Sequence, residues 1–138
     1  MSEGAFLDTN ILVYSVSADP TRAEVAHQLL RGGGHVSVQV CNEFASVALR
    51  KLSMPVAEIG VVLQAVFTTC EVHDLTLETH LGALRLVDRY GFSFYDALLA
   101  QSAVTAGCDT LWSEDFQNGF KVGRSLTIRN PFAPVSGS

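Results

Sequence analysis

The sequence predicts an α/β protein with a mainly parallel sheet of about five strands and helices on both faces. Two observations support this class: short apolar or β-branched segments alternate with longer amphipathic ones, and glycine, proline or helix-capping residues separate them. Strands that alternate with helices in this way pair in parallel through right-handed crossovers. The chain has 138 residues without a repeat or linker, so we expect one domain over residues 1–138.

Helix-capping residues, prolines and glycines divide the N-terminal half into successive helices and strands. Asp19 is a typical helix N-cap and is followed by Pro20, which suits the first helical position, and the glycine run 32–34 ends that helix. Pro55 separates two later segments of helical apolar spacing. These signals predict, in order, a strand over 5–7, a short helix over 10–16, a helix over 20–31, a strand over 35–38, a helix over 40–52 and a helix over 56–70.

The same signals divide the C-terminal half. Thr76 and Ser93 are expected helix caps, and Gly91 and Gly107 are expected helix ends. Before Thr76 and after Gly107, the apolar segments are too short for helices and are expected to be strands. The predicted elements are a strand over 71–73, a helix over 77–90, a helix over 94–106, a strand over 110–112 and a fifth strand within 125–129.

The composition is typical of a globular cytosolic protein. Hydrophobic residues make up 48% of the chain and charged residues 17%. No apolar run approaches the ~20 residues of a membrane span, and Ser2-Glu3-Gly4 stands where a secretory signal would carry basic residues. We therefore expect a cytoplasmic location without membrane contact. The cysteines and histidines are scattered without CxxC, HxH or HxxxH spacing, so neither a disulfide framework nor a zinc site is expected.

Four carboxylates fall where a parallel sheet would bring them to one edge. Asp8 follows the first strand and Asp115 the fourth, while Glu43 and Asp96 lie in the first turns of helices. Crowded carboxylates repel one another unless a cation compensates them, and hard oxygen ligands suit Mg²⁺ or Mn²⁺. Taken singly, Glu43 and Asp96 also fit acidic residues that stabilise a helix N-terminus. The joint placement favours a metal site.

The sequence resembles the PIN-domain ribonucleases, and among them the VapC-type toxins of bacterial toxin–antitoxin modules. Four blocks in the family's order and spacing carry the resemblance: Phe6-Leu7-Asp8-Thr9-Asn10-Ile11-Leu12, Asn42-Glu43-Phe44, Phe94-Tyr95-Asp96-Ala97-Leu98-Leu99-Ala100 and Leu111-Trp112-Ser113-Glu114-Asp115-Phe116. The resemblance implies a PIN-like α/β/α sandwich and a metal-dependent endoribonuclease. It implies Mg²⁺ (or Mn²⁺) as cofactor and the four carboxylates Asp8, Glu43, Asp96 and Asp115 as metal ligands and catalytic residues.

The identity of the fourth ligand is open between two adjacent acids. Asp115 is preferred over Glu114 because it stands two residues after Ser113, as the family's aspartate follows a serine or threonine. The resemblance implies that Asn10 and Ser113 contact the ligands rather than the ion, and Glu114 is expected beside them.

The implied partners are an RNA substrate, a small antitoxin protein and a second copy of the chain in a homodimer. The net charge of −5 disfavours a broad basic nucleic-acid surface. Only a few basic residues remain as candidate phosphate contacts: Arg50, Lys51, Lys121 and Arg124. An antitoxin helix is expected to lie in an apolar groove near Phe44, Val47 and the segment 56–67, with an Arg or Lys inserted among the carboxylates.

The alternative hypothesis is a non-catalytic PIN-like or receiver-like regulatory module. A receiver should show adjacent acids after its first strand and a lysine after its last, whereas Asp8 stands alone and no lysine follows Lys121. A degenerate PIN scaffold usually lacks members of the acidic set, and this sequence keeps all four.

Overall fold

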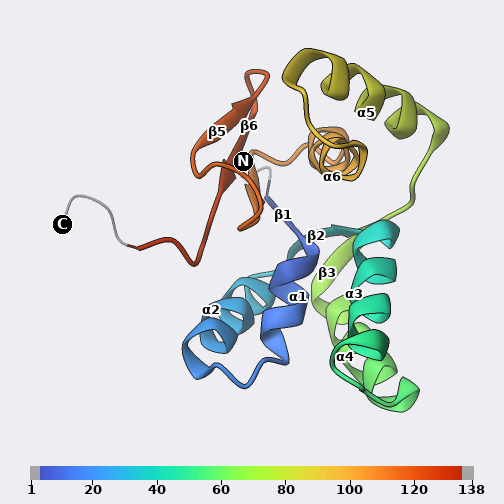
Figure 1. The fold of residues 1–138 in the computed structure, drawn as a ribbon, viewed down its shortest axis with the longest axis vertical. Coiled ribbons are helices and arrows are strands. Elements are labelled where there is room, and N and C mark those ends of the chain that lie inside the picture. The colour runs from blue at the N-terminus through green and yellow to red at the C-terminus, as the bar shows by residue number, and fades with distance from the viewer. Residues whose placement is uncertain (1–3, 135–138) are drawn as a thin grey trace.

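The computed structural model describes residues 4–134 and confirms an α/β fold around a mainly parallel sheet (Figure 1). The Ser2-Glu3 start and the last residues of the expected domain 1–138 lie outside the described residues. The sheet order is β3-β2-β1-β4-β6-β5, and every pairing is parallel except the antiparallel pair of β5 and β6. The strands are β1 (Ala5–Leu7), β2 (Gly34–Ser37), β3 (Cys70–His73), β4 (Thr110–Trp112), β5 (Phe120–Val122) and β6 (Leu126–Arg129).

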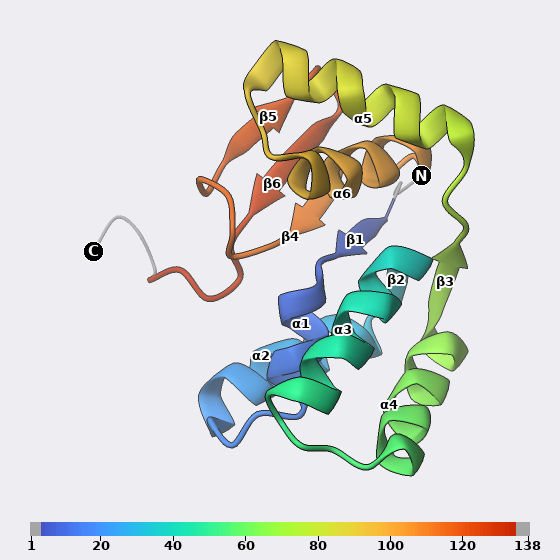
Figure 2. The same cartoon turned by 45° about the vertical axis from the view of Figure 1, so that its right-hand side comes forward.

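The helices form two groups on opposite sides of the sheet. Helices α5 and α6 pack together on one side, and α1 to α4 gather on the other (Figure 2). Their bounds are α1 (Thr9–Ser15), α2 (Pro20–Arg31), α3 (Val38–Arg50), α4 (Val56–Thr69), α5 (Leu77–Tyr90) and α6 (Phe94–Thr105). In residues 4–134, no helix combines the length and the apolar composition that crossing a membrane requires.

The expected capping residues act as caps. The Asp19 carboxylate accepts hydrogen bonds from the backbone N–H groups of Thr21 and Arg22 at the start of α2. Thr76 and Ser93 likewise accept from the third residue of α5 and α6. Gly91 ends α5 with a φ of 74°, a left-handed conformation that glycine adopts without steric cost.

Two elements differ from the sequence prediction. Helix α3 begins at Val38 rather than Val40. Ser37, the last residue of β2, is its N-cap, and the Ser37 hydroxyl accepts a hydrogen bond from the Val40 N–H at 3.2 Å. Strand β5 was not predicted, and the sheet therefore has six strands rather than five. Its three residues are too few to show alternation, and it forms only because β6 supplies a neighbouring strand with which it pairs.

One large apolar core holds the strands and the inner faces of the helices together. Its fully buried side chains include Phe6, Leu12, Phe44 and Leu111. A smaller cluster of Ala83, Ala97 and Leu98 joins α5 to α6. These contacts fix the carboxyl ends of β1 and β4 beside each other, with the N-termini of α1 and α6 at the same edge.

Candidate active site

The four predicted carboxylates lie on elements that begin or end at the carboxyl edge of the sheet. Asp8 joins β1 to α1, and its backbone N–H donates to the carbonyl of Trp112 at the end of β4 at 3.1 Å. Asp115 follows β4, Glu43 lies on α3 beyond β2, and Asp96 lies in the first turn of α6. Because parallel strands end at one edge, residues far apart in the chain meet there.

Asp8 is the buried centre of this group. It is 6% exposed, its Oδ1 accepts from the Thr9 N–H at 2.6 Å, and its Oδ2 accepts from the Ser113 hydroxyl at 2.6 Å. The pKa of Asp8 is raised from 3.8 to about 7: burial is the main cause and the charges of Asp115 and Glu43 add to it, while the hydrogen bonds from Ser113 and Thr9 act in the lowering direction. The ionised form of Asp8 is therefore disfavoured near neutral pH, and a nearby positive charge would stabilise it.

Asn10 and Ser113 connect Asp8 to Asp115. The Asn10 amide donates to Asp8 Oδ2 at 3.2 Å and to Asp115 Oδ2 at 3.3 Å. The fully buried Ser113 hydroxyl donates to Asp8 while it accepts from the Asp115 backbone N–H at 3.1 Å. Burial raises the pKa of Asp115, and the neighbouring Glu114 and Asp96 carboxylates contribute to the same rise. Asn10 and Ser113 therefore each form hydrogen bonds with both Asp8 and Asp115.

Glu43 and Asp96 complete the group from opposite sides. The Thr9 hydroxyl donates to Glu43 Oε1 at 3.1 Å, so the residue after Asp8 links it to α3. Asp96 is half-buried, and its charge acts on Asp115. Sequence reasoning did not single out Thr9. Its position between Asp8 and Asn10 was the available signal, but no local pattern shows that its hydroxyl reaches another helix.

Glu114 is paired with side chains outside the set of four carboxylates. Its carboxylate accepts from the Tyr14 hydroxyl at 2.8 and 3.1 Å and pairs with Arg22 at 3.2 Å. The Arg22 guanidinium lies over the rings of Tyr14 and Phe132, which fixes it in this position. Glu114 therefore has its own cation, whereas Asp115 faces Asp8 through Asn10. The geometry favours Asp115 as the fourth member of the set.

The four predicted basic residues lie on different elements, and not all of them are on the side of the sheet that carries the carboxylates. Arg50 lies on α3 about two turns beyond Glu43 and donates to the Ser46 hydroxyl at 3.0 Å, and Lys51 caps the end of that helix. Lys121 lies on β5 and donates to Thr127. Arg124 lies in the turn between β5 and β6, at the amino edge of the sheet. That turn is opposite the carboxylates, so the structure does not bring Arg124 to the site.

The charge of the group is not balanced by the protein. Over residues 4–134, no lysine, arginine or histidine forms an ion pair with Asp8, Glu43, Asp96 or Asp115. No three of these carboxylates bring oxygens within 4.8 Å of one another there, as repulsion without a cation would predict. The Asn10 Oδ1 is buried without a hydrogen-bond partner in the described chain. A hard divalent cation with its bound waters would fit this donor set, since it supplies both positive charge and hydrogen-bond donors.

Comparison with known protein families identifies the family to which the chain belongs. Residues 5–121 match the model of the PIN domain family, and the chain therefore belongs to that family. The matched segment contains all four carboxylates. A search of curated protein sequences gives no match.

Solved structures with the same fold include toxins and toxin–antitoxin complexes. VapC20 of Mycobacterium tuberculosis, a toxin that cleaves the sarcin–ricin loop, has a TM-score of 0.66 and 18% identity over 80% of this chain and 91% of its own. A toxin–antitoxin complex from Klebsiella pneumoniae has a TM-score of 0.69 and 14% identity over 93% and 98% of the two chains. VapBC2 of Rickettsia felis, bound to a promoter DNA fragment, has a TM-score of 0.65 and 19% identity over 91% of this chain and 97% of its own.

Proposed function

We propose that this protein is a metal-dependent endoribonuclease of the VapC type that is held inactive by a small antitoxin. The observation that carries the proposal is the acidic group at this edge: Asp8 is buried, the charges of Glu43 and Asp115 act on it, the charge of Asp96 acts on Asp115, and residues 4–134 supply no ion-paired cation to any of the four. The PIN family match and the toxins that share the fold support the same activity.

Asp8, Glu43, Asp96 and Asp115 are the residues that would hold Mg²⁺ or Mn²⁺. When bound, the ion would activate a water for attack on a phosphodiester and offset charge on the phosphoryl oxygens. The chain supplies the arrangement of ligands. The Thr9 N–H and the Ser113 hydroxyl direct the Asp8 oxygens, and the Asn10 amide holds Asp8 and Asp115 together. Such contacts orient ligands before substrate arrives.

Arg50 and Lys51 are the proposed contacts to substrate phosphates. Arg50 shares a helix face with Glu43, and both basic side chains are exposed at the end of α3. A phosphate contact of this kind positions RNA without reading its bases. We keep Lys121 as a secondary contact, because its ammonium group is exposed on the edge strand β5.

Cleavage of total RNA with Mg²⁺ tests the activity. The Asp96→Asn variant should lose about 100-fold or more of the rate, because it removes a ligand, while its circular dichroism spectrum stays native. Asp88→Asn is the matched control, since Asp88 is exposed on α5 outside the site. Equal cleavage by wild type and Asp96→Asn would contradict the assignment. Absence of cleavage by the wild type with either metal would favour the non-catalytic module.

An apolar groove beside α4 is the proposed seat of the antitoxin helix. The groove encloses about 370 Å³ between α1, α2 and α4, and a second hollow of about 430 Å³ continues it along α4. Val61 is 70% exposed there. The expected groove lies near Phe44, Val47 and the segment 56–67. This groove includes Val61 and Val66 of that segment, its facing side is lined by Val16 and Leu30, and Phe44 is fully buried in the core.

Co-purification from the native operon tests the partner. A small protein with an amphipathic helix and a basic residue should be recovered, and Val61→Glu should abolish its binding without affecting RNA cleavage by the free enzyme. The groove and the acidic site are then separable. Binding that persists in Val61→Glu would place the antitoxin elsewhere.

A further inference from the structure

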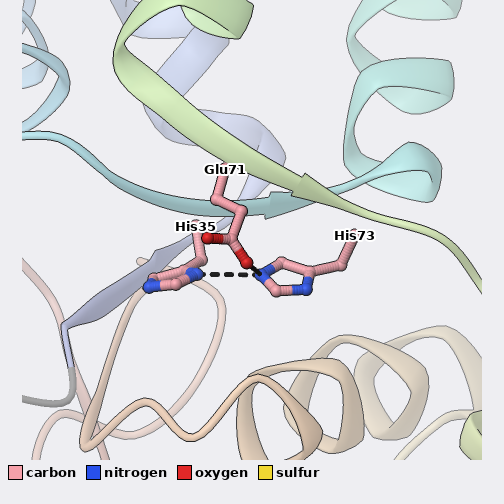
Figure 3. A group of neighbouring side chains, drawn as sticks. All are labelled: His35, Glu71 and His73. Carbon is pink, nitrogen blue, oxygen red and sulfur yellow. Dashed lines mark hydrogen bonds and ion pairs between the residues drawn. The ribbon is translucent and has the colours of Figure 1, made fainter.

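Two histidines and a glutamate from neighbouring strands meet outside the acidic site. His35 lies on β2, and Glu71 and His73 lie on the edge strand β3 (Figure 3). In the parallel register His35 is opposite Glu71, and His73 follows two residues later on the same face of β3. The sequence separates His35 from His73 by more than thirty positions, so only the pairing of β2 with β3 brings the rings together.

The donor atoms of the three side chains converge on a small space. His35 Nδ1 lies 2.8 Å from His73 Nε2, and Glu71 Oε2 lies 3.4 Å from the same His73 nitrogen. One donor atom from each residue falls within 4.8 Å of the other two, and residues 4–134 contain no other such set of three. Figure 3 shows the Glu71 carboxylate reaching down between the two rings.

The spacing is close to that of a metal site. Two nitrogens that bind one tetrahedral Zn²⁺ at 2.0–2.1 Å stand roughly 3.3 Å apart. The histidine nitrogens at 2.8 Å would have to separate by about half an ångström, and that movement is small for side chains on adjacent strands. A direct hydrogen bond requires a proton on one of these nitrogens, and a metal ion would replace that proton.

The surroundings hold the rings and leave one side open. Gly4 backs the His35 ring so closely that a Cβ at Gly4 would lie 3.0 Å from Nε2. The Phe6 ring lies 6.3 Å from the His73 ring. The Glu71 side chain is 68% exposed, and a cavity of about 240 Å³ adjoins His73. The exposed Glu71 side chain would therefore give an ion access to the site from solvent.

We propose that His35, Glu71 and His73 form a second metal site, which binds Zn²⁺ through two imidazole nitrogens and one carboxylate oxygen. This donor set suits Zn²⁺, whereas the all-oxygen set around Asp8 suits Mg²⁺, so the two sites select different ions. The bound ion would join the edge strand β3 to β2 and stabilise this side of the sheet. The inference does not depend on the nuclease activity.

Zinc titration of the full chain, followed by NMR of the imidazole nitrogens, tests the proposal. Millimolar Mg²⁺ is present throughout to occupy the acidic site. At one equivalent of Zn²⁺ the His35 and His73 resonances should shift, while those of His27 and His80 should stay in place as internal controls. Competition with a chromophoric chelator should show at least ~100-fold weaker binding in His73→Ala and unchanged binding in His80→Ala.

A milder variant guards against misfolding of His73→Ala. Glu71→Gln keeps the volume of an exposed side chain, and it should weaken Zn²⁺ binding about 10-fold to 100-fold while the melting temperature without metal is unchanged. Resonances of His35 and His73 that do not move would overturn the proposal. So would zinc binding that survives in Glu71→Gln and His73→Ala but is lost in Asp8→Asn, because the ion would then sit in the acidic site.

Discussion

Replacement of Asp8 by asparagine should change the stability of the metal-free protein in opposite directions at high and low pH. The pKa of Asp8 is about 7 in the folded protein, compared with 3.8 for an unperturbed aspartate, because burial disfavours the charged form. Between these values the folded state binds a proton that the unfolded chain has lost. The free energy of unfolding of the wild type therefore falls as pH rises through this window.

The magnitude follows from the two pKa values and from the hydrogen bonds. The difference between 3.8 and about 7 corresponds to about 4 kcal/mol at pH 8. Asparagine carries no charge and so removes this electrostatic cost. Its single oxygen can accept from Ser113 and Asn10, but its NH₂ group then faces the Thr9 N–H, so two donors meet without an acceptor. That mismatch costs about 1–3 kcal/mol. Asp8→Asn should be more stable than wild type by about 1–3 kcal/mol at pH 8 and less stable by about 1–2 kcal/mol at pH 4.

Urea unfolding in EDTA at pH 4, 6 and 8 measures the effect, with Asp88→Asn as the control on an exposed carboxylate. Added Mg²⁺ at pH 8 should stabilise the wild type and reverse the order of the two proteins, since an ion bound only by the folded state raises its stability. A stability difference between Asp8→Asn and wild type that is the same at every pH would refute the reasoning about burial.

Two further predictions concern the backbone and the thiols. Gly34→Ala should lower the free energy of unfolding in urea by about 2–3 kcal/mol, because Gly34 has a φ of 149° and a Cβ there would lie 2.8 Å from the Ala5 carbonyl oxygen. Gly60→Ala should raise it by about 0.5–1 kcal/mol, because the added Cβ in α4 meets nothing within 4 Å. Equal effects of the two substitutions would contradict the steric argument. Burial raises the pKa of Cys41, Cys70 and Cys108, that of Cys108 to about 12, so alkylation at pH 8 should be slow in the native protein and complete in urea; rapid native labelling would show that these thiols are accessible.

The sequence by itself determined most of the architecture and the composition of the acidic edge. Caps such as Asp19, Thr76 and Ser93 are local signals, because each side chain bonds to a backbone N–H only a few residues away. The four carboxylates could be assigned to one edge since every strand that precedes them runs in the same direction. Their roles as ligands remain a prediction.

Only the tertiary structure decided which neighbouring or distant residues meet. Glu114 and Asp115 are adjacent in sequence, and the choice between them depends on Tyr14 and Arg22, which hold Glu114 on α1 and α2. Arg124 resembled Lys121 as a basic residue near the end of the chain, but the direction of β6 places its turn at the amino edge.

The histidines show the same limit. No spacing rule links His35 to His73, because their meeting depends on the order and register of β2 and β3, which are set by packing across the whole sheet. Local periodicity and capping are written in neighbouring residues, and the sequence reveals them directly. Strand register and side-chain encounters arise from contacts between distant segments, and for that physical reason they became visible only in the folded chain.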